Sequence, residues 1–257
     1  SYEGEGYKYD SRDYYATVYA NQDLTVELVG TNTLKETENA SEAIFIGDSG
    51  SLTFNGIGSL NATGTANGIY STGTLTFNGS VSLNATGTDD GIHSLGTLTF
   101  NGGTIVSTGG LGGIYCHHHD IKINGGNVTA SGKYGGLWSH GGYVEILGGN
   151  VTATAGVDQA IKFSTGFNVA KGMNIQASTT VDGELGEYVA ANHNSYKKIV
   201  IHTPDVYVGG VGMCDGDYLA VGATETTDTQ PSGGYAYYNN GTLTLNNYEH
   251  EGIGYKA

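Results

Sequence analysis

The sequence is short of proline, of basic residues and of long apolar runs. Its 257 residues include only two prolines, and ten lysines and arginines stand against 25 aspartates and glutamates, for a formal net charge of −15. An acidic surface of this kind repels nucleic acid and anionic lipid, so we expect neither as a partner. No window is apolar enough to cross a membrane, and none has the period of a long amphipathic helix. We therefore expect no membrane insertion and a chain built from strands.

Cysteine is scarce as well. Cys116 and Cys214 lie far apart and match no metal or redox spacing. They form either one disulfide in an oxidising compartment or two free thiols. The chain opens on SYEGEG, with no methionine and no apolar leader, and we interpret it as a mature or excised segment. The phrase NYEHEGIGYKA near the other end echoes this opening, as expected of one unit in a longer tandem array.

Glycine is abundant, with 44 residues, and much of it belongs to a repeat. GIYSTGTLTFNGSVSLNATGTDD (68–90) is followed directly by GIHSLGTLTFNGGTIVSTGGLG (91–112), and related copies run from Thr17 to residue 178. A period of roughly 22–26 residues over about seven copies indicates a solenoid, in which each repeat buries its apolar face against its neighbours.

Each copy contains three short apolar-alternating segments separated by glycine or polar turns. Successive residues of a strand point to opposite faces, so each segment has an inward and an outward set. The predicted inward column of the first segment is Ile44, Ile69, Ile92, Ile114, Leu137 and Ile161. The predicted inward residues of the second segment are Leu52/Phe54, Leu75/Phe77, Leu98/Phe100, Ile121/Ile123 and Val144/Ile146. The predicted inward residues of the third segment are Leu60, Leu83, Ile105, Val128, Val151 and Ile175. Beside them runs a column of small residues: Ala62, Ala85, Ser107, Ala130, Ala153 and Ala177.

Asparagine follows the second segment in four consecutive copies, at Asn55, Asn78, Asn101 and Asn124. An asparagine at such a bend can adopt the left-handed conformation and bond to the asparagine of the next turn. We expect a stabilising ladder there and no binding site.

The pattern changes near Asp205, where short strands alternate with Gly and Asn-Asn-Gly turns typical of antiparallel pairing. The sequence therefore predicts an all-β chain. Residues 1–204 form a parallel β-helix with three strands per turn and clear repeats over 17–178, right-handed by the general preference for parallel crossovers. Residues 205–257 form a C-terminal β segment, which either caps the stack or begins a following module.

Three phrases resemble a known family: LTVELVGTNTL (24–34), DVYVGGV (205–211) and GGYAYYNNGTLTLNNYEHEGI (233–253). They are similar to modules of large cell-surface proteins of gut Firmicutes, which are described as pectin-lyase-like β-helices or carbohydrate-binding domains. The resemblance covers most of the chain and carries no catalytic signature. It implies a secreted or cell-wall-attached location.

The outward residue of the first segment is aromatic in most copies. This column comprises Tyr19, Phe45, Tyr70, His93, Tyr115, Trp138 and Lys162. Coils spaced about 4.8 Å apart would turn it into a continuous strip of rings, and flat aromatic faces pack against the C–H faces of sugars. Three interpretations remain open: a glycan-binding strip, stacking that only stabilises the coils, or burial under the tyrosine-rich start or the C-terminal strands.

Two metal sites are candidates. His117 and His140 fall in register on adjacent turns, so their imidazoles could meet one Zn²⁺ or copper ion, with Cys116, His118, His119 or Asp120 completing it. The alternative is an exposed polar turn. Glu42, Asn67 and Asp90, with Asp89 beside them, form an oxygen-bearing column that suits Ca²⁺, or else are solvated turn residues. No cofactor is required by any motif.

The function expected from these features is a non-catalytic extracellular module that binds a polysaccharide or host glycan or mediates adhesion, and that contacts other modules of its own chain. The alternatives are a calcium-dependent polysaccharide lyase or hydrolase, and a passive stalk. A lyase needs a basic proton abstractor, and Arg12, the sole arginine, lies outside the clear repeats. A hydrolase needs facing carboxylates, whereas the adjacent Asp89 and Asp90 would point to opposite sides of an extended chain.

Overall fold

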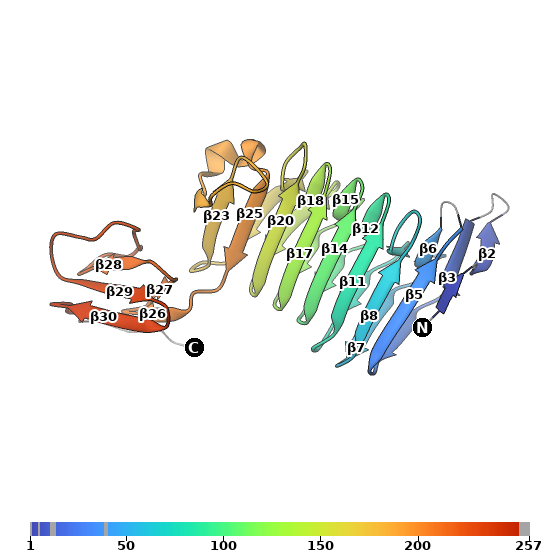
Figure 1. Cartoon of the computed structure of the whole chain (residues 1–257), viewed down its shortest axis with the longest axis horizontal. Coiled ribbons are helices and arrows are strands. Elements are labelled where there is room, and N and C mark those ends of the chain that lie inside the picture. Colours follow the sequence, from blue (N-terminus) through green and yellow to red (C-terminus); the bar gives the residue numbers. More distant parts are fainter. Residues whose placement is uncertain (1, 5, 11–13, 39–40, 252–257) are drawn as a thin grey trace. The chain divides into compact units, whose positions relative to one another are not determined.

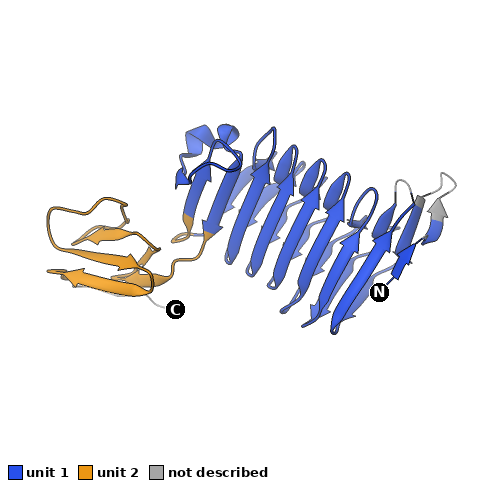
Figure 2. Ribbon diagram, viewed as in Figure 1, with its two compact units in different colours: residues 1–170, 175–201 blue, residues 171–174, 202–257 orange. Residues whose placement is uncertain are grey.

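The computed structural model describes residues 2–4, 6–10, 14–38 and 41–251. The chain divides into two compact units, residues 1–170 with 175–201 and residues 171–174 with 202–257 (Figure 2). The first unit is a β-solenoid of about seven turns, as the repeat predicts. Figure 1 shows its strands as arrows stacked side by side, with successive turns in sequence order.

Each turn of the solenoid contributes one strand to each of three sheets. The first-segment sheet contains, in spatial order, β2 (Tyr7–Asp10), β3 (Tyr14–Ala20), β6 (Glu42–Ile46), β9 (Ile69–Ser71), β12 (Asp90–Ser94), β15 (Gly112–Cys116), β18 (Gly135–Ser139) and β21 (Ile161–Phe163). The second-segment sheet contains β22 (Gly166–Val169), β19 (Tyr143–Ile146), β16 (Ile121–Ile123), β13 (Leu98–Phe100), β10 (Leu75–Phe77), β7 (Leu52–Gly56) and β4 (Leu24–Leu28).

The third-segment sheet is the longest. Its order is β1 (Tyr2–Gly4), β5 (Thr31–Glu36), β8 (Ser59–Thr63), β11 (Ser82–Gly87), β14 (Thr104–Gly109), β17 (Asn127–Gly132), β20 (Asn150–Ala155), β25 (Lys198–His202), β23 (Asn174–Ser178) and β24 (Gly186–Glu187). The strands from β1 to β20 pair in parallel.

The core of the solenoid consists of the inward columns that the sequence predicts. Ile69 pairs with Ile44 on one side and Ile92 on the other, and all three are buried. In the second-segment sheet, Phe54, Phe77 and Phe100 are fully buried and stack with ring centroids 5.1 and 5.0 Å apart and nearly parallel planes. Apolar burial and these ring contacts hold successive turns together.

The asparagine ladder is confirmed, although its backbone differs from the expectation. The Nδ2 groups of Asn78, Asn101 and Asn124 donate to Oδ1 of the preceding asparagine at 3.1, 2.8 and 2.7 Å. The asparagines do not have positive φ, which falls instead on the glycines that follow, such as Gly103 at 84°. A Cβ on Gly103 would also lie 2.4 Å from the carbonyl oxygen of Val81. Glycine takes the left-handed turn at little steric cost, so the asparagine joins the ladder without adopting a positive φ itself.

The prediction that Ile175 and Ala177 continue the third column after Val151 is wrong. The antiparallel strand β25 pairs with β20 in that place, and Ile201 stands opposite Val151. Ile199 and Ile201 are fully buried. The physical reason is that antiparallel pairing satisfies the same backbone groups while β-branched residues at alternate positions still fill the column.

The end of the solenoid also carries a short 3-10 helix, η1 (Ala190–Ser195), which the repeat does not predict. His193 of this helix is buried, and its Nε2 lies 2.7 Å from the carbonyl oxygen of Ile161. The Tyr188 hydroxyl lies 2.8 Å from Nδ1 of the same ring. The contact with Ile161 attaches η1 to β21, the last strand of the first-segment sheet.

The second unit is antiparallel, as expected from Asp205 onward. It contains the pair β26 (Val206–Val208) and β27 (Val211–Met213), and the sheet β28 (Tyr218–Ala220), β29 (Tyr235–Asn239) and β30 (Thr242–Asn246). Its small core comprises Met213, Leu219 and Ala236.

Candidate functional site

The aromatic column lies on the outer face of the first-segment sheet. Parallel pairing places Tyr19, Phe45, Tyr70, His93, Tyr115, Trp138 and Lys162 directly opposite one another on successive turns. All seven side chains are partly buried, because each is covered by its neighbours along the column. The sequence predicted this register correctly.

The first half of the column is a parallel stack. Tyr19 and Phe45 have centroids 5.7 Å apart and planes 3° apart, and Phe45 and Tyr70 have centroids 5.2 Å apart at 12°. Tyr7, from β2, extends the stack by one ring at 5.2 Å. Rings arranged in this way cover one another's faces, so this half stabilises the turns by cross-strand contact and presents mainly ring edges outward.

The second half is arranged differently, because the rings are tilted. His93 lies 44° from Tyr70 and 83° from Tyr115, and Tyr115 lies 52° from Trp138, with centroids 4.7–4.8 Å apart. Burial raises the pKa of the Tyr115 hydroxyl, and the Asp90 charge adds to this effect. Tyr115 is therefore a protonated hydroxyl that can donate a hydrogen bond beside ring surface that is not covered by a parallel neighbour.

His93 is held by Asp90, a contact that the sequence analysis missed. Asp90 Oδ2 lies 3.0 Å from His93 Nδ1, and Asp90 is 6% exposed. Nε2 of the same imidazole is buried and has no hydrogen-bond partner. A ligand outside the column therefore cannot reach this atom without displacing a neighbouring ring. The sequence contained one indication of this contact, because Asp90 and His93 are three residues apart at the start of β12.

The oxygen-bearing column proposed for calcium is a buried ladder. Asn67 Nδ2 donates to Glu42 Oε1 at 3.3 Å, and the Asp90 amide donates to Asn67 Oδ1 at 3.2 Å. Glu42, Asn67 and Asp90 are all buried, whereas Asp89 is exposed. Partial burial and the neighbouring Asp90 charge raise the pKa of Asp89. The structure thus brings three of the four predicted residues together, with oxygens that bond within the column.

A second column runs beside the aromatic one and contains His117 and His140. Their rings lie 5.3 Å apart and 9° from parallel, so the predicted register is correct. Tyr115 lies 5.7 Å from His117, and Trp138 lies 6.1 Å from His140. Burial and the neighbouring imidazoles lower the pKa of His117. No group of three or more metal-ligating side chains occurs among the residues that the structure describes.

Two of the other residues considered for the His117 site, Cys116 and Asp120, are turned away or engaged elsewhere, whereas His118 Nε2 lies 2.8 Å from His117 Nδ1. Cys116 points into the core, fully buried, and burial raises the pKa of its thiol to about 11. Asp120 Oδ1 accepts the Tyr143 amide at 2.9 Å, and its Oδ2 pairs with Lys122 at 3.5 Å. His118 and His119 are exposed on the turn.

Lys162 ends the aromatic column by covering Trp138. Its Nζ lies 3.9 Å from the centroid of the indole ring and 2.8 Å from Asp158 Oδ2. Trp138 is thus neither fully exposed nor buried under another strand. One face of its ring is covered by the Lys162 ammonium group, which a ligand must displace to contact that face. The sequence placed Lys162 in the column but did not indicate its contact with Asp158.

We call the tilted half of the outer face the histidine–aromatic patch. It comprises His93, Tyr115, His117, Trp138, His140 and Lys162. It combines ring faces, imidazole edges and one ammonium group on four adjacent strands, β12, β15, β18 and β21, and on the turns that follow β15 and β18. Arg12, the one arginine considered as a lyase base, lies outside the described residues.

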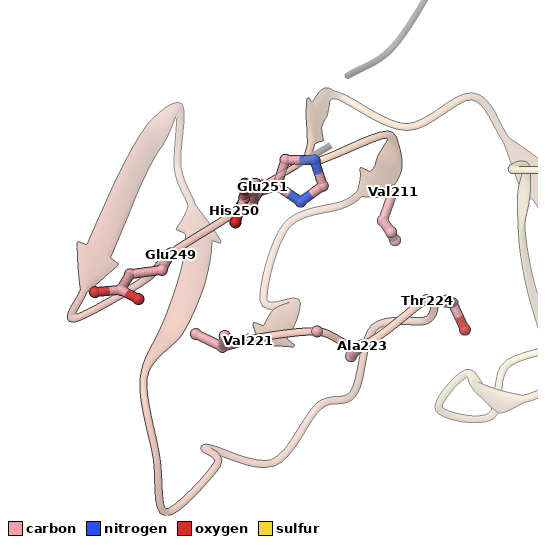
Figure 3. A pocket seen from close by; sticks show the side chains of 9 residues that line it. Val211, Val221, Ala223, Thr224, Glu249, His250 and Glu251 are labelled. Carbon is pink, nitrogen blue, oxygen red and sulfur yellow. The ribbon is translucent and has the colours of Figure 1, made fainter. Parts of the chain in front are cut away.

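The second unit holds an open pocket and the second cysteine. The pocket is lined by Gly209, Val211, Val221, Gly222, Ala223, Thr224, Glu249, His250 and Glu251 (Figure 3). Cys214 is buried, and burial raises the pKa of its thiol to about 11. Cys116 and Cys214 are both free thiols in this structure.

The family of the chain is shown by comparison with known proteins. A family model described as carbohydrate-binding domain-containing protein matches residues 16–253. Comparison with curated proteins and with solved structures finds no match. Among the described residues, no helix is long and apolar enough to cross a membrane. Because the family match extends over far more than half of the residues, the chain belongs to the family of carbohydrate-binding domain-containing proteins.

Proposed function

We propose that the protein is a non-catalytic, extracellular glycan-binding module that holds a polysaccharide or host glycan on the histidine–aromatic patch. The observation that carries the proposal is the family match, which spans the solenoid repeats that build the patch. Family membership supports the ligand class, and the geometry of the outer face supports the proposed location.

The patch has the two kinds of surface that a sugar ring needs. The tilted faces of Tyr115 and Trp138 can pack against apolar C–H faces, and sugar hydroxyls can bond to the Tyr115 hydroxyl, the imidazoles of His117 and His140 and the Lys162 ammonium group. The parallel stack of Tyr19, Phe45 and Tyr70 lacks this combination, because its faces cover one another. We therefore propose the second half of the column, and not the whole column, as the glycan site.

The carboxylates near the patch support binding in preference to hydrolysis. Asp90 is buried and bonded to His93, and Asp158 is paired with Lys162. Glycosidic cleavage by two acids requires two free carboxyl groups that flank an open site, whereas these two carboxylates are engaged by His93 and Lys162. The cysteine thiols, with pKa values near 11, are poor nucleophiles at neutral pH.

An extracellular role agrees with the resemblance to cell-surface modules and with the acidic surface, which has a net charge of −15. In that setting, the solenoid would present its outer face to a glycan while other modules of the same protein supply further contacts. Linked modules raise the effective concentration at each site, so a single patch of modest affinity is sufficient.

A glycan array followed by titration tests the proposal. Trp138 is the only tryptophan, so a ligand on the patch must change its fluorescence, whereas a ligand elsewhere leaves it unchanged. Incubation with uronide-rich polysaccharides provides the catalytic control. New ultraviolet absorbance from unsaturated ends would contradict the non-catalytic role, and an array with no glycan bound would contradict glycan binding.

A further inference from the structure

The turn after β15 brings two imidazole nitrogens together at the edge of the patch. His117 Nδ1 and His118 Nε2 lie 2.8 Å apart, and the His118 side chain is exposed. The two rings are 4.0 Å apart between centroids and meet at 61°. The two nitrogens therefore face each other from adjacent residues on an accessible turn.

This separation is close to that of two nitrogens bound to one metal ion. With Zn–N bonds of about 2.0–2.1 Å, ligands at about 90–109° from each other lie about 2.9–3.4 Å apart. A bound ion would lie beside the line that joins the two nitrogens, so both rings would rotate until their lone pairs converge on it, while the N–N distance grows by a few tenths of an ångström. Each ring would then carry its proton on the other nitrogen, which is an ordinary neutral tautomer.

The other histidines of the solenoid make different contacts. His93 is bonded to Asp90, and His193 is bonded to the Ile161 carbonyl oxygen and Tyr188. His117 and His118 instead bond to each other, which is the arrangement that a metal ion can replace. The parallel His140 ring, 5.3 Å away, packs on His117 and limits its rotation.

We propose that His117 and His118 form a two-nitrogen site for a divalent transition-metal ion such as Zn²⁺. His140 positions the His117 ring, and water fills the remaining coordination positions. Imidazole nitrogen is a preferred ligand for Zn²⁺, Cu²⁺ and Ni²⁺, whereas Ca²⁺ prefers oxygen, so the chemistry selects a transition metal. The net charge of −15 raises the local concentration of any cation. Both ligands come from the chain, so the ion binds without a glycan, and His117 belongs both to this site and to the histidine–aromatic patch.

Calorimetric titration of the full chain with Zn²⁺ alone tests this site. We expect one saturable equivalent of Zn²⁺, weakened by about tenfold or more in His117→Ala and in His118→Ala. His119→Ala removes the next residue on the same turn and is the matched control, with affinity within about twofold of the parent. His140→Ala should weaken binding less than either ligand substitution. Circular dichroism verifies that each variant is folded.

Long-range ¹H–¹⁵N spectra of the histidine rings provide a second readout. Zn²⁺ should shift His117 Nδ1 and His118 Nε2, and leave both nitrogens of the His193 ring unchanged. Absence of saturable binding, equal loss in His119→Ala, or shifts confined to other rings would overturn the proposal. Because no glycan is present, these results are independent of the glycan-binding test.

Discussion

Truncation of Phe77 probes the stack that joins successive turns of the solenoid. The Phe77 ring lies between Phe54 and Phe100, at 5.1 and 5.0 Å, and all three side chains are 0% exposed. A buried phenylalanine removes about 150–250 Å² from water, which at about 25 cal/mol per Å² corresponds to roughly 4–6 kcal/mol as an upper limit. Phe77→Ala retains a methyl group, so we expect a loss of about 3–5 kcal/mol in the free energy of unfolding.

Urea unfolding followed by circular dichroism measures this loss. Thr76→Ala is the matched control, because Thr76 lies on the same strand with its side chain on the outer face and should cost less than about 1 kcal/mol. Phe77→Leu, which refills part of the cavity, should fall between the two variants. A Phe77→Ala loss below about 1 kcal/mol, or an equal loss in Thr76→Ala, would refute the inward and outward assignment of the second-segment sheet.

Three further predictions concern the ladder, the end of the solenoid and the thiols. Asn101→Ala should cost about 1–2 kcal/mol in chemical unfolding, because Asn101 donates to Asn78 and accepts from Asn124; no measurable loss would contradict a stabilising ladder. Burial lowers the pKa of His193 below its ordinary 6.5, because the buried site favours the neutral ring. The neutral ring therefore contributes stability above pH 6.5, and this contribution is lost as the pH falls through the lowered pKa. Thermal unfolding should show this loss of stability at acidic pH in the parent protein and a smaller loss in His193→Gln. Equal pH profiles of the two proteins would contradict the assignment of the loss to His193. Burial of Cys116 and Cys214 should make both thiols slow to alkylate at pH 8 until urea unfolds the chain, and rapid native labelling of either would contradict this.

Most of the solenoid could be predicted from the sequence because its repeat fixes the register. Once Ile69 and Ile92 are aligned, Tyr70 and His93 must fall next to each other on the outer face. The antiparallel entry of β25 could not be predicted, since KIVIH has the same alternation as a parallel strand. Alternation specifies which residues face inward but not the direction of the strand.

The site was predicted less completely than the fold. The column itself follows from the register, but the tilt of the Tyr115 and Trp138 rings depends on side-chain packing that no spacing encodes. The position of Lys162 over the indole arises from its bond with Asp158, four residues earlier on the turn. At the bends of the asparagine ladder, the sequence contains both asparagine and glycine, and it did not indicate that the glycine would take the positive φ.

The affinity of the protein for an array-selected glycan, compared between Trp138→Ala and Tyr143→Ala, tests the central claim most directly. Tyr143 is an exposed aromatic residue on the second-segment sheet of the same solenoid, 37% exposed and outside the histidine–aromatic patch. The account predicts that Trp138→Ala weakens binding by about 1–3 kcal/mol, as expected for a central aromatic contact, while Tyr143→Ala leaves the affinity unchanged. Unchanged affinity in a folded Trp138→Ala variant, or an equal loss in both variants, would contradict a glycan site on this patch.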